Sequence, residues 1–198
     1  MPETVNKFGI IVLAAGASTR MGRPKQLLPF IGETLIEHAV RTALNSGADD
    51  VTVVVGAEEA VVRAKLERFP VRIIFNGDWQ EGMGSSIRRG VAAQAAEVTC
   101  LVISPCDQPL VTAELYRELA ERQIKTQARI VASSYNGVIG APCAFGQEMF
   151  PKLMALQGDT GARQLIRNSL LPVEIVEFAG GNLDVDTIED YQSLVDSV

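Results

Sequence analysis

Short apolar runs alternate with amphipathic stretches along most of the chain. The apolar runs are rich in β-branched residues, as buried parallel strands are, and they predict strands over residues 9–14, 51–56, 71–75, 100–104 and 130–134. Apolar positions at helical spacing predict helices over 34–45, 58–69, 85–96 and 112–123. Repeated β-α-β units indicate a three-layer α/β/α fold, in which helices cover both faces of a mostly parallel sheet.

The last third of the chain is less regular. It predicts strands over 141–145 and 173–178 and helices over 147–156, 160–168 and 188–198. We expect one late strand to be antiparallel, and we expect Thr187 to cap the closing helix together with Asp190. The chain has 198 residues and no internal repeat or clear linker, so we expect a single domain over residues 1–198.

The segment 10–25 combines a strand, a turn of small residues and a loop that carries Arg20, Arg23 and Lys25. Small residues let backbone N–H groups approach phosphate oxygens closely, and the cations offset negative charge. The segment is not a P-loop, because Arg23 follows Gly22, and it lacks the dinucleotide fingerprint. It favours a triphosphate site; the alternative is an ordinary connection whose cations are solvated.

Two acidic segments also follow or flank predicted strands. Asp107 comes after the strand 100–104 and lies between two prolines, which restrict the shape of its turn. A carboxylate fixed at the carboxyl end of a strand suits Mg²⁺, although a turn aspartate can also bond its own backbone. Asp184 and Asp186 are two positions apart in an extended segment, so their side chains should point to opposite sides.

Composition excludes several classes of function. A net charge of −6 argues against general nucleic-acid binding, and no apolar run approaches the length of a membrane span. The polar start has no signal-peptide core, so we expect a cytoplasmic protein. Three cysteines without a C-x-x-C pair make a disulfide framework or a zinc knuckle unexpected. His38 is the only histidine; we expect it at the surface or boundary, and no Ser-His-Asp triad is evident.

Several motifs together resemble those of the MobA-like nucleotidyltransferases. They occur in the family's order over nearly the whole chain: LAAGASTRMGRPK at 13–25, LLP at 27–29, GMGSS at 82–86, CDQP at 106–109, GAP at 140–142 and DVDT at 184–187. Within the family, the chain is most similar to the molybdenum cofactor cytidylyltransferases. The resemblance implies a Rossmann-like fold of the nucleotide-diphospho-sugar transferase type.

The resemblance also implies the reaction. An acceptor phosphate attacks the α-phosphorus of a nucleoside triphosphate, and pyrophosphate leaves. Lys25 and Arg20 are the expected catalytic residues, because they can offset the charge that develops on the leaving group. Asp107 and Asp186 are the expected ligands of Mg²⁺, or of Mn²⁺ in its place. A phosphate nucleophile is already ionised near neutral pH, so no general base is needed.

Further residues are assigned by the same resemblance. The expected nucleotide-binding residues are Leu13, Ala14, Ala15, Gly16, Arg20, Lys25, Asn76, Gly84, Ser85 and Asp107. The expected acceptor-side residues are Gln108, Gly140 and Pro142. Ala141 departs from the pattern, because molybdenum cofactor relatives often carry a histidine there, and this weakens the assignment of a pterin acceptor.

The resemblance favours CTP, because Ala14-Ala15-Gly16 accompanies cytidylyl transfer in this family. The implied acceptor is molybdopterin, and a molybdoenzyme would receive the product. The alternatives are a GTP-using molybdenum cofactor guanylyltransferase, or a cytidylyltransferase for a small sugar or polyol phosphate. A nucleotide- or cofactor-binding accessory protein without turnover is a further alternative. A NAD-dependent oxidoreductase is less favoured, because the dinucleotide fingerprint is missing.

Overall fold

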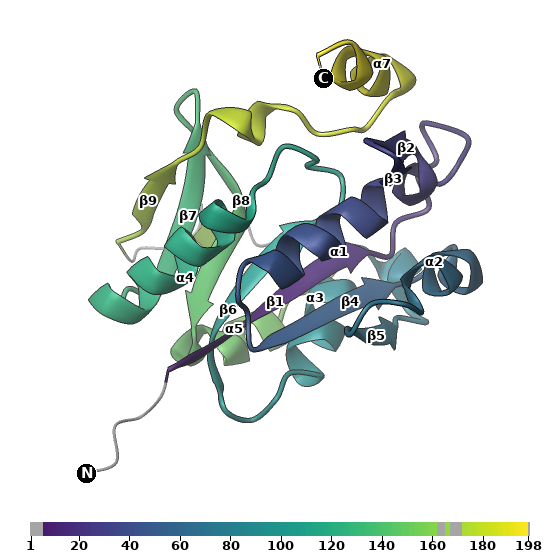
Figure 1. Ribbon diagram of the computed structural model, residues 1–198. Helices are drawn as coiled ribbons and strands as arrows, with labels where there is room; N and C mark the ends of the chain where they lie inside the picture. The colour runs from purple at the N-terminus through teal and green to yellow at the C-terminus, as the bar shows by residue number, and fades with distance from the viewer. Residues whose placement is uncertain (1–5, 162–164, 167–171, 198) are drawn as a thin grey trace.

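A seven-stranded sheet lies at the centre of the molecule, in the order β5-β4-β1-β6-β8-β7-β9 (Figure 1). The computed structural model describes residues 6–161, 165–166 and 172–197. The strands of this sheet are β1 (Lys7–Ala14), β4 (Asp50–Val55), β5 (Arg72–Phe75), β6 (Val98–Pro105), β7 (Ile130–Tyr135), β8 (Val138–Gly146) and β9 (Glu174–Glu177). Strand β8 is antiparallel to β6 and β7, whereas the other pairings are parallel. The predicted mostly parallel sheet with one late antiparallel strand is confirmed.

Helices cover both faces of this sheet (Figure 1). One face packs against α1 (Leu35–Asn45), α2 (Glu59–Leu66) and α4 (Ala113–Thr126), and the other against α3 (Met83–Ala92) and α5 (Phe150–Met154). Side chains of β1 alternate between the two cores: Ile10 and Val12 join the first, and Ile11 and Leu13 the second. The three-layer α/β/α architecture is therefore confirmed.

Several element boundaries differ from the prediction. Helix α3 begins earlier than expected because Gly82, at φ +110°, precedes it as the N-cap residue. The stretch 147–156 divides into the 3₁₀ turn η3 (Gln147–Met149) and α5. The helix predicted over 160–168 falls mostly outside the described residues. Every helix within the described part is too short or too polar to cross a membrane.

A third apolar cluster joins the segment after β1 to the C-terminal part of the chain. The helix α7 (Ile188–Asp196) packs beside the hairpin of β2 (Pro29–Phe30) and β3 (Glu33–Thr34), which was not predicted because its strands are too short to show a pattern. The Tyr191 hydroxyl donates to the Pro29 carbonyl at 2.7 Å. Thr187 and Asp190 form the expected capping box of α7. The cluster fixes the loop after β1 against the segment that precedes α7.

Three loops meet at one edge of the sheet because of its topology. β1 and β6 are parallel neighbours, and Leu13 pairs with Pro105, so their carboxyl ends lie together. β8 runs the opposite way and pairs Cys143 with Ile103, which brings its beginning to the same edge. Ligands of open α/β sheets bind at this edge.

Candidate active site

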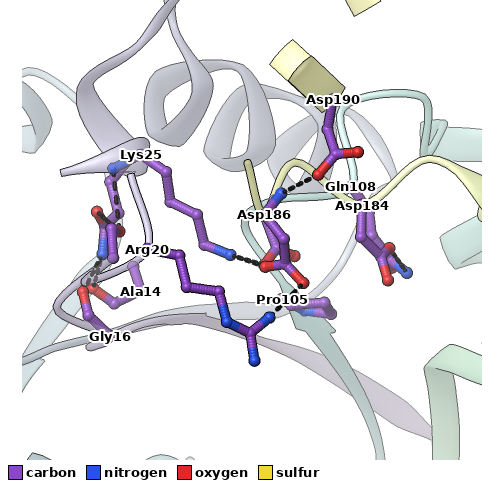
Figure 2. Close-up of polar contacts among 12 residues, drawn as sticks. Ala14, Gly16, Arg20, Lys25, Pro105, Gln108, Asp184, Asp186 and Asp190 are labelled. Carbon is purple, nitrogen blue, oxygen red and sulfur yellow. Dashed lines mark hydrogen bonds and ion pairs between the residues drawn. The ribbon is translucent and has the colours of Figure 1, made fainter. Parts of the chain in front are cut away.

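Lys25 lies between two carboxylates at this edge of the sheet. Its Nζ is 2.5 Å from Asp107 Oδ2 and 2.7 Å from Asp186 Oδ1, and Figure 2 shows Lys25 reaching toward Asp186. The side chains of Lys25 and Asp107 are 15% and 16% exposed, whereas Asp186 is 49% exposed. Lys25 comes from the 3₁₀ turn η1 (Lys25–Leu27) after β1, Asp107 from the turn after β6, and Asp186 from the segment before α7.

The charges of this cluster stabilise one another. Burial by itself would lower the pKa of Lys25, but the carboxylates of Asp107 and Asp186 outweigh it and raise this pKa above its ordinary value. Arg20 adds a second cation, since its Nη1 lies 3.9 Å from Asp186 Oδ2 (Figure 2). The guanidinium of Arg20 is largely exposed, so this longer contact leaves it free to turn toward an anion.

The turn that carries Asp107 is fixed on both sides by backbone hydrogen bonds. The Cys106 N–H donates to the Leu13 carbonyl at 3.1 Å, and the Val185 N–H donates to the Asp107 carbonyl at 2.9 Å. The second carboxylate oxygen, Oδ1 of Asp107, is buried and has no hydrogen-bond partner among the described residues. An unpartnered buried carboxylate oxygen is costly, by about 1–3 kcal/mol or more, unless a donor or cation reaches it.

Asp107 and Asp186 together suit a hard divalent cation. Carboxylate oxygens are ligands that Mg²⁺ and Mn²⁺ accept, and one or two carboxylates beside substrate phosphates are enough for Mg²⁺. Within the described residues, no group of three or more His, Cys, Asp and Glu side chains is placed to hold a metal ion. The donor set therefore fits a metal that shares its coordination with a phosphate ligand, and the unpartnered Oδ1 of Asp107 supports this fit.

Asp184 contacts Gln108, and it lines the same cavity as Lys25 and Asp186. The Gln108 Nε2 donates to Asp184 Oδ1 at 2.8 Å (Figure 2). Partial removal from water and the nearby negative charges of Asp107 and Asp186 raise the pKa of Asp184, although the Gln108 hydrogen bond acts in the opposite direction. Gln108 and Asp184 thus form a polar pair beside the Lys25 cluster.

Two cavities share a wall at this cluster. The first, of about 400 Å³, is lined by residues 13–19 and by Gly82, Met83 and Ser86 from the beginning of α3. The second, of about 330 Å³, is lined by Gln108, Gly140, Ala141, Tyr135 and Asp184, among others. The residues that line both cavities are Leu13, Lys25, Met83, Pro105 and Asp107. Lys25 and Asp107 therefore face two binding spaces at once.

The structure does not bring Asn76 and Ser85 to the first cavity. Both are buried, and the Asn76 Nδ2 donates to the hydroxyl oxygens of Ser85 and Ser86 at 2.8 and 3.0 Å. The side chains of Asn76 and Ser85 therefore hydrogen-bond within the protein and hold the loop before α3 in place. Ser86 lines the first cavity in place of Ser85.

Gly84 and Pro142 also lie outside the walls of the cavities. The N–H of Gly84 donates to the Gly158 carbonyl at 2.9 Å, so Gly84 packs against the loop after α5. The Pro142 carbonyl accepts from the Ser133 hydroxyl at 2.8 Å, and Gly140 and Ala141 line the second cavity instead. The contacts of Gly84 and Pro142 are with the protein itself.

The family described as the MobA-like NTP transferase domain matches residues 10–173. The chain belongs to this family. The match extends from β1 to the residue before β9, so it includes Lys25, Asp107 and the other residues that line the first cavity. The family resemblance and the Rossmann-like fold expected from the motifs are thereby confirmed.

Relatives of this chain bear names that denote different activities. Nicotine blue oxidoreductase of Paenarthrobacter nicotinovorans is 34% identical and covers 93% of this chain and 95% of its own. Molybdenum cofactor cytidylyltransferase of Escherichia coli is 26% identical over 91% of this chain and 92% of its own. A probable molybdenum cofactor guanylyltransferase of Mycobacterium tuberculosis is 36% identical over 66% of this chain and 63% of its own. Two of these names are those of nucleotidyltransferases, one cytidylyl and one guanylyl, and the third is that of an oxidoreductase.

A solved structure matches this chain over nearly its whole length. The crystal structure of Rv0371c from Mycobacterium tuberculosis is 30% identical, has a TM-score of 0.88, and covers 98% of this chain and 100% of its own. The same Mycobacterium protein in complex with manganese is 29% identical, has a TM-score of 0.84, and covers the same shares.

Gln26 is a residue of the site region that the sequence analysis missed. It is buried, and its Nε2 donates to the carbonyls of Gly16 at 2.7 Å and Ala14 at 3.2 Å. The Lys25 N–H donates to the Ser18 hydroxyl at 3.0 Å, with Ser18 at φ +52°. These bonds fold the loop over Gln26. Nothing in the spacing separates Gln26 from a solvated glutamine, so the sequence carried no signal for it.

Proposed function

We propose that residues 1–198 act as one divalent-metal-dependent cytidylyltransferase domain. It would transfer CMP from CTP to a phosphorylated acceptor, with molybdopterin favoured, and release pyrophosphate. The observation that carries this proposal is the wall of Lys25 and Asp107 shared by two cavities. A transferase must hold two substrates with their reacting phosphates adjacent, and fixed charges at the meeting point stabilise the transition state.

The residues of the first cavity suit the triphosphate. The small residues 14–16 allow the backbone to approach phosphate oxygens, and Gln26 holds the carbonyls of this loop away from them. In the reaction, an acceptor phosphate oxygen bonds to the α-phosphorus while the bond from this phosphorus to the pyrophosphate oxygen breaks. The ammonium of Lys25 would offset the charge that the departing pyrophosphate gains. The planar guanidinium of Arg20 would donate paired hydrogen bonds to a phosphate at the opening of the cavity.

Asp107 and Asp186 would hold the metal, whose chemistry is to neutralise phosphate charge during transfer. The unpartnered Oδ1 of Asp107 supports this assignment, and the manganese complex of the Mycobacterium protein supports a divalent metal in this fold. The proposal implies that Lys25 leaves its two carboxylates when the metal and the nucleotide bind, and that its ammonium then turns to the phosphates.

The choice of CTP rests on the Ala14-Ala15-Gly16 motif, and the choice of molybdopterin on the family resemblance. A guanylyltransferase is the nearest alternative, because the guanylyltransferase relative is 36% identical over the part that it matches. A small sugar or polyol phosphate is an alternative acceptor. A molybdoenzyme is the proposed recipient of the product.

A second candidate, an oxidoreductase, is favoured by the 34% identical relative that bears this name. The loop after β1 lacks the glycine pattern that seats a dinucleotide on a helix N-terminus, and 3₁₀ turn η1 follows it instead. A nucleotide-binding accessory protein is the non-enzymatic alternative. We favour transfer over both because Lys25 and Asp107 face two cavities.

Pyrophosphate release tests the proposal. CTP, GTP, ATP and UTP are each supplied with Mg²⁺ or Mn²⁺, and with molybdopterin, a sugar or polyol phosphate, or no acceptor. Oxidation of a nicotinamide cofactor is followed in parallel. We expect release with CTP that depends on molybdopterin. Release with GTP alone would move the protein to the guanylyl branch, and release only with a sugar or polyol phosphate would replace the acceptor. Nicotinamide oxidation without pyrophosphate release would contradict transfer, and tight CTP binding without either reaction would indicate an accessory protein.

A further inference from the structure

His38 joins helix α1 to the turn that carries Asp107. Its Nε2 lies 3.1 Å from the Pro109 carbonyl oxygen, and its Nδ1 lies 3.2 Å from Glu33 Oε1. The side chain is 23% exposed, so the expected boundary position is confirmed. Pro109 follows Asp107 closely in the chain, which places this histidine within one contact of the site although its sequence position is remote from the motifs.

Both ring nitrogens of His38 face hydrogen-bond acceptors. A neutral imidazole carries one N–H and can donate to Glu33 or to Pro109, whereas the imidazolium donates to both. Glu33 is itself fixed, since the Arg41 guanidinium donates to its Oε2 at 2.8 and 3.0 Å.

The remaining surroundings of His38 are apolar, neutral polar or acidic. The Phe30 ring packs edge-on at 4.8 Å between ring centroids. Glu114, from the beginning of α4, lines the same cavity of about 470 Å³ as His38 and Pro109. This cavity gives protons access to the ring. The charged groups near His38 are therefore Glu33 and Arg41 on the α1 side and Glu114 on the α4 side.

We propose that the His38 imidazolium is a positioning residue that holds the Asp107 turn through the Pro109 carbonyl, so that its protonation tunes the transfer reaction. When the proton is lost, Glu33 retains the remaining N–H at Nδ1, because a hydrogen bond to a carboxylate is the stronger one. A lone pair at Nε2 then faces the lone pairs of the Pro109 carbonyl. The turn shifts away, and Asp107 moves relative to Lys25.

The expected sign follows from this repulsion. Activity is full while His38 carries both protons and falls when the ring loses one of them. A small displacement of a positioned group lowers turnover strongly, so we expect a fall in kcat of about tenfold across the transition, with little change in the KM for CTP.

NMR offers a test that does not require turnover, because one histidine gives one set of imidazole signals. We expect the backbone amide signals of residues 106–108 to shift with the same pH midpoint as the imidazole. In His38→Gln the amide nitrogen replaces Nε2 as a donor to Pro109 without a titratable charge. That variant should keep most of the activity and lose the pH step in both amide shifts and kcat.

Two further variants serve as comparisons. Asn is too short to reach Pro109, so His38→Asn should have a lowered kcat at every pH. Glu33→Gln removes the carboxylate that retains the N–H at Nδ1, so a neutral ring can donate to Pro109 and the pH step in kcat should shrink. Amide signals that ignore the imidazole titration, or a pH step that persists in His38→Gln, would overturn the proposal. The kinetic arm rests on the proposed function, whereas the NMR arm decides the role of His38 even if no pyrophosphate is released.

Discussion

The Lys25 ammonium lies 2.5 Å from the Asp107 carboxylate, although the two residues are 82 positions apart in the chain. The contact joins the loop after β1 to the turn after β6, and Asp186 completes it at 2.7 Å. Lys25 is therefore a resident cation between the two carboxylates that we assign to the metal. A metal held by these carboxylates would compete with Lys25 for the same oxygens until a triphosphate offered the ammonium another anionic partner.

This competition predicts the metal affinity of a lysine variant. Lys25→Gln removes the competing charge, so the protein without nucleotide should bind Mn²⁺ more tightly, by about an order of magnitude for one charge at close range. Electron paramagnetic resonance of free Mn²⁺ measures this affinity directly. Arg23→Gln, which neutralises a neighbouring cation outside the proposed site, serves as the control and should bind Mn²⁺ as the natural protein does. Weaker Mn²⁺ binding by Lys25→Gln would contradict the competition.

Turnover should respond in the opposite direction. Lys25→Ala removes the charge that stabilises the leaving pyrophosphate, and we expect kcat to fall by about 10²–10³ while the fold is retained. Arg23→Ala should leave kcat near its original value. Pyrophosphate release at saturating CTP, together with thermal unfolding curves, provides both readouts. Near-normal turnover in Lys25→Ala would remove this lysine from the mechanism.

Gln26 should matter for the nucleotide loop. Gln26→Leu has a similar volume but leaves the carbonyls of Ala14 and Gly16 without their donor. We expect a loss of about 1–3 kcal/mol in the free energy of unfolding and weaker CTP binding, because the loop no longer folds over the side chain. Denaturant titration and calorimetry measure the two effects. Unchanged CTP affinity would show that the loop keeps its shape without Gln26.

The cap of α7 should make stability depend on pH. Hydrogen bonds from the Thr187 hydroxyl and backbone lower the pKa of Asp190, and the folded state therefore favours the carboxylate. A group with a lowered pKa in the folded state stabilises the protein above its unfolded pKa, about 4 for aspartate, and loses this effect at lower pH. Denaturation of the natural protein and Asp190→Asn should differ near neutral pH and converge in acid. A difference that stays constant with pH would exclude the charged cap.

Simple rules predicted that Lys25 and Asp107 lie at one edge of the sheet, whereas Asp186 was assigned by the family resemblance. Apolar runs define the strands, parallel strands bring their carboxyl ends to one edge, and the motifs follow those ends. No such rule predicts the hydrogen-bond partners of individual polar side chains. Asn76 and Ser85 bond each other in the interior, which depends on how the loop packs.

The contact of His38 with Pro109 spans 71 positions and depends on the placement of α1 beside the turn after β6. No periodicity in the chain carries that information, so the sequence analysis could place His38 at a boundary but could not name its neighbour. Gln26 was missed for a similar reason, since its partners are backbone carbonyls that every residue type offers.

Label transfer tests the central claim that one wall serves two substrates. CTP labelled at the α-phosphate is supplied with molybdopterin and Mg²⁺, and the label is followed into the acceptor while pyrophosphate is measured in the same reaction. We predict one labelled acceptor for each pyrophosphate released, and loss of both products together in Lys25→Ala. Pyrophosphate without label in the acceptor would mean hydrolysis of CTP, and would contradict the claim that the two cavities hold a nucleotide and its acceptor together.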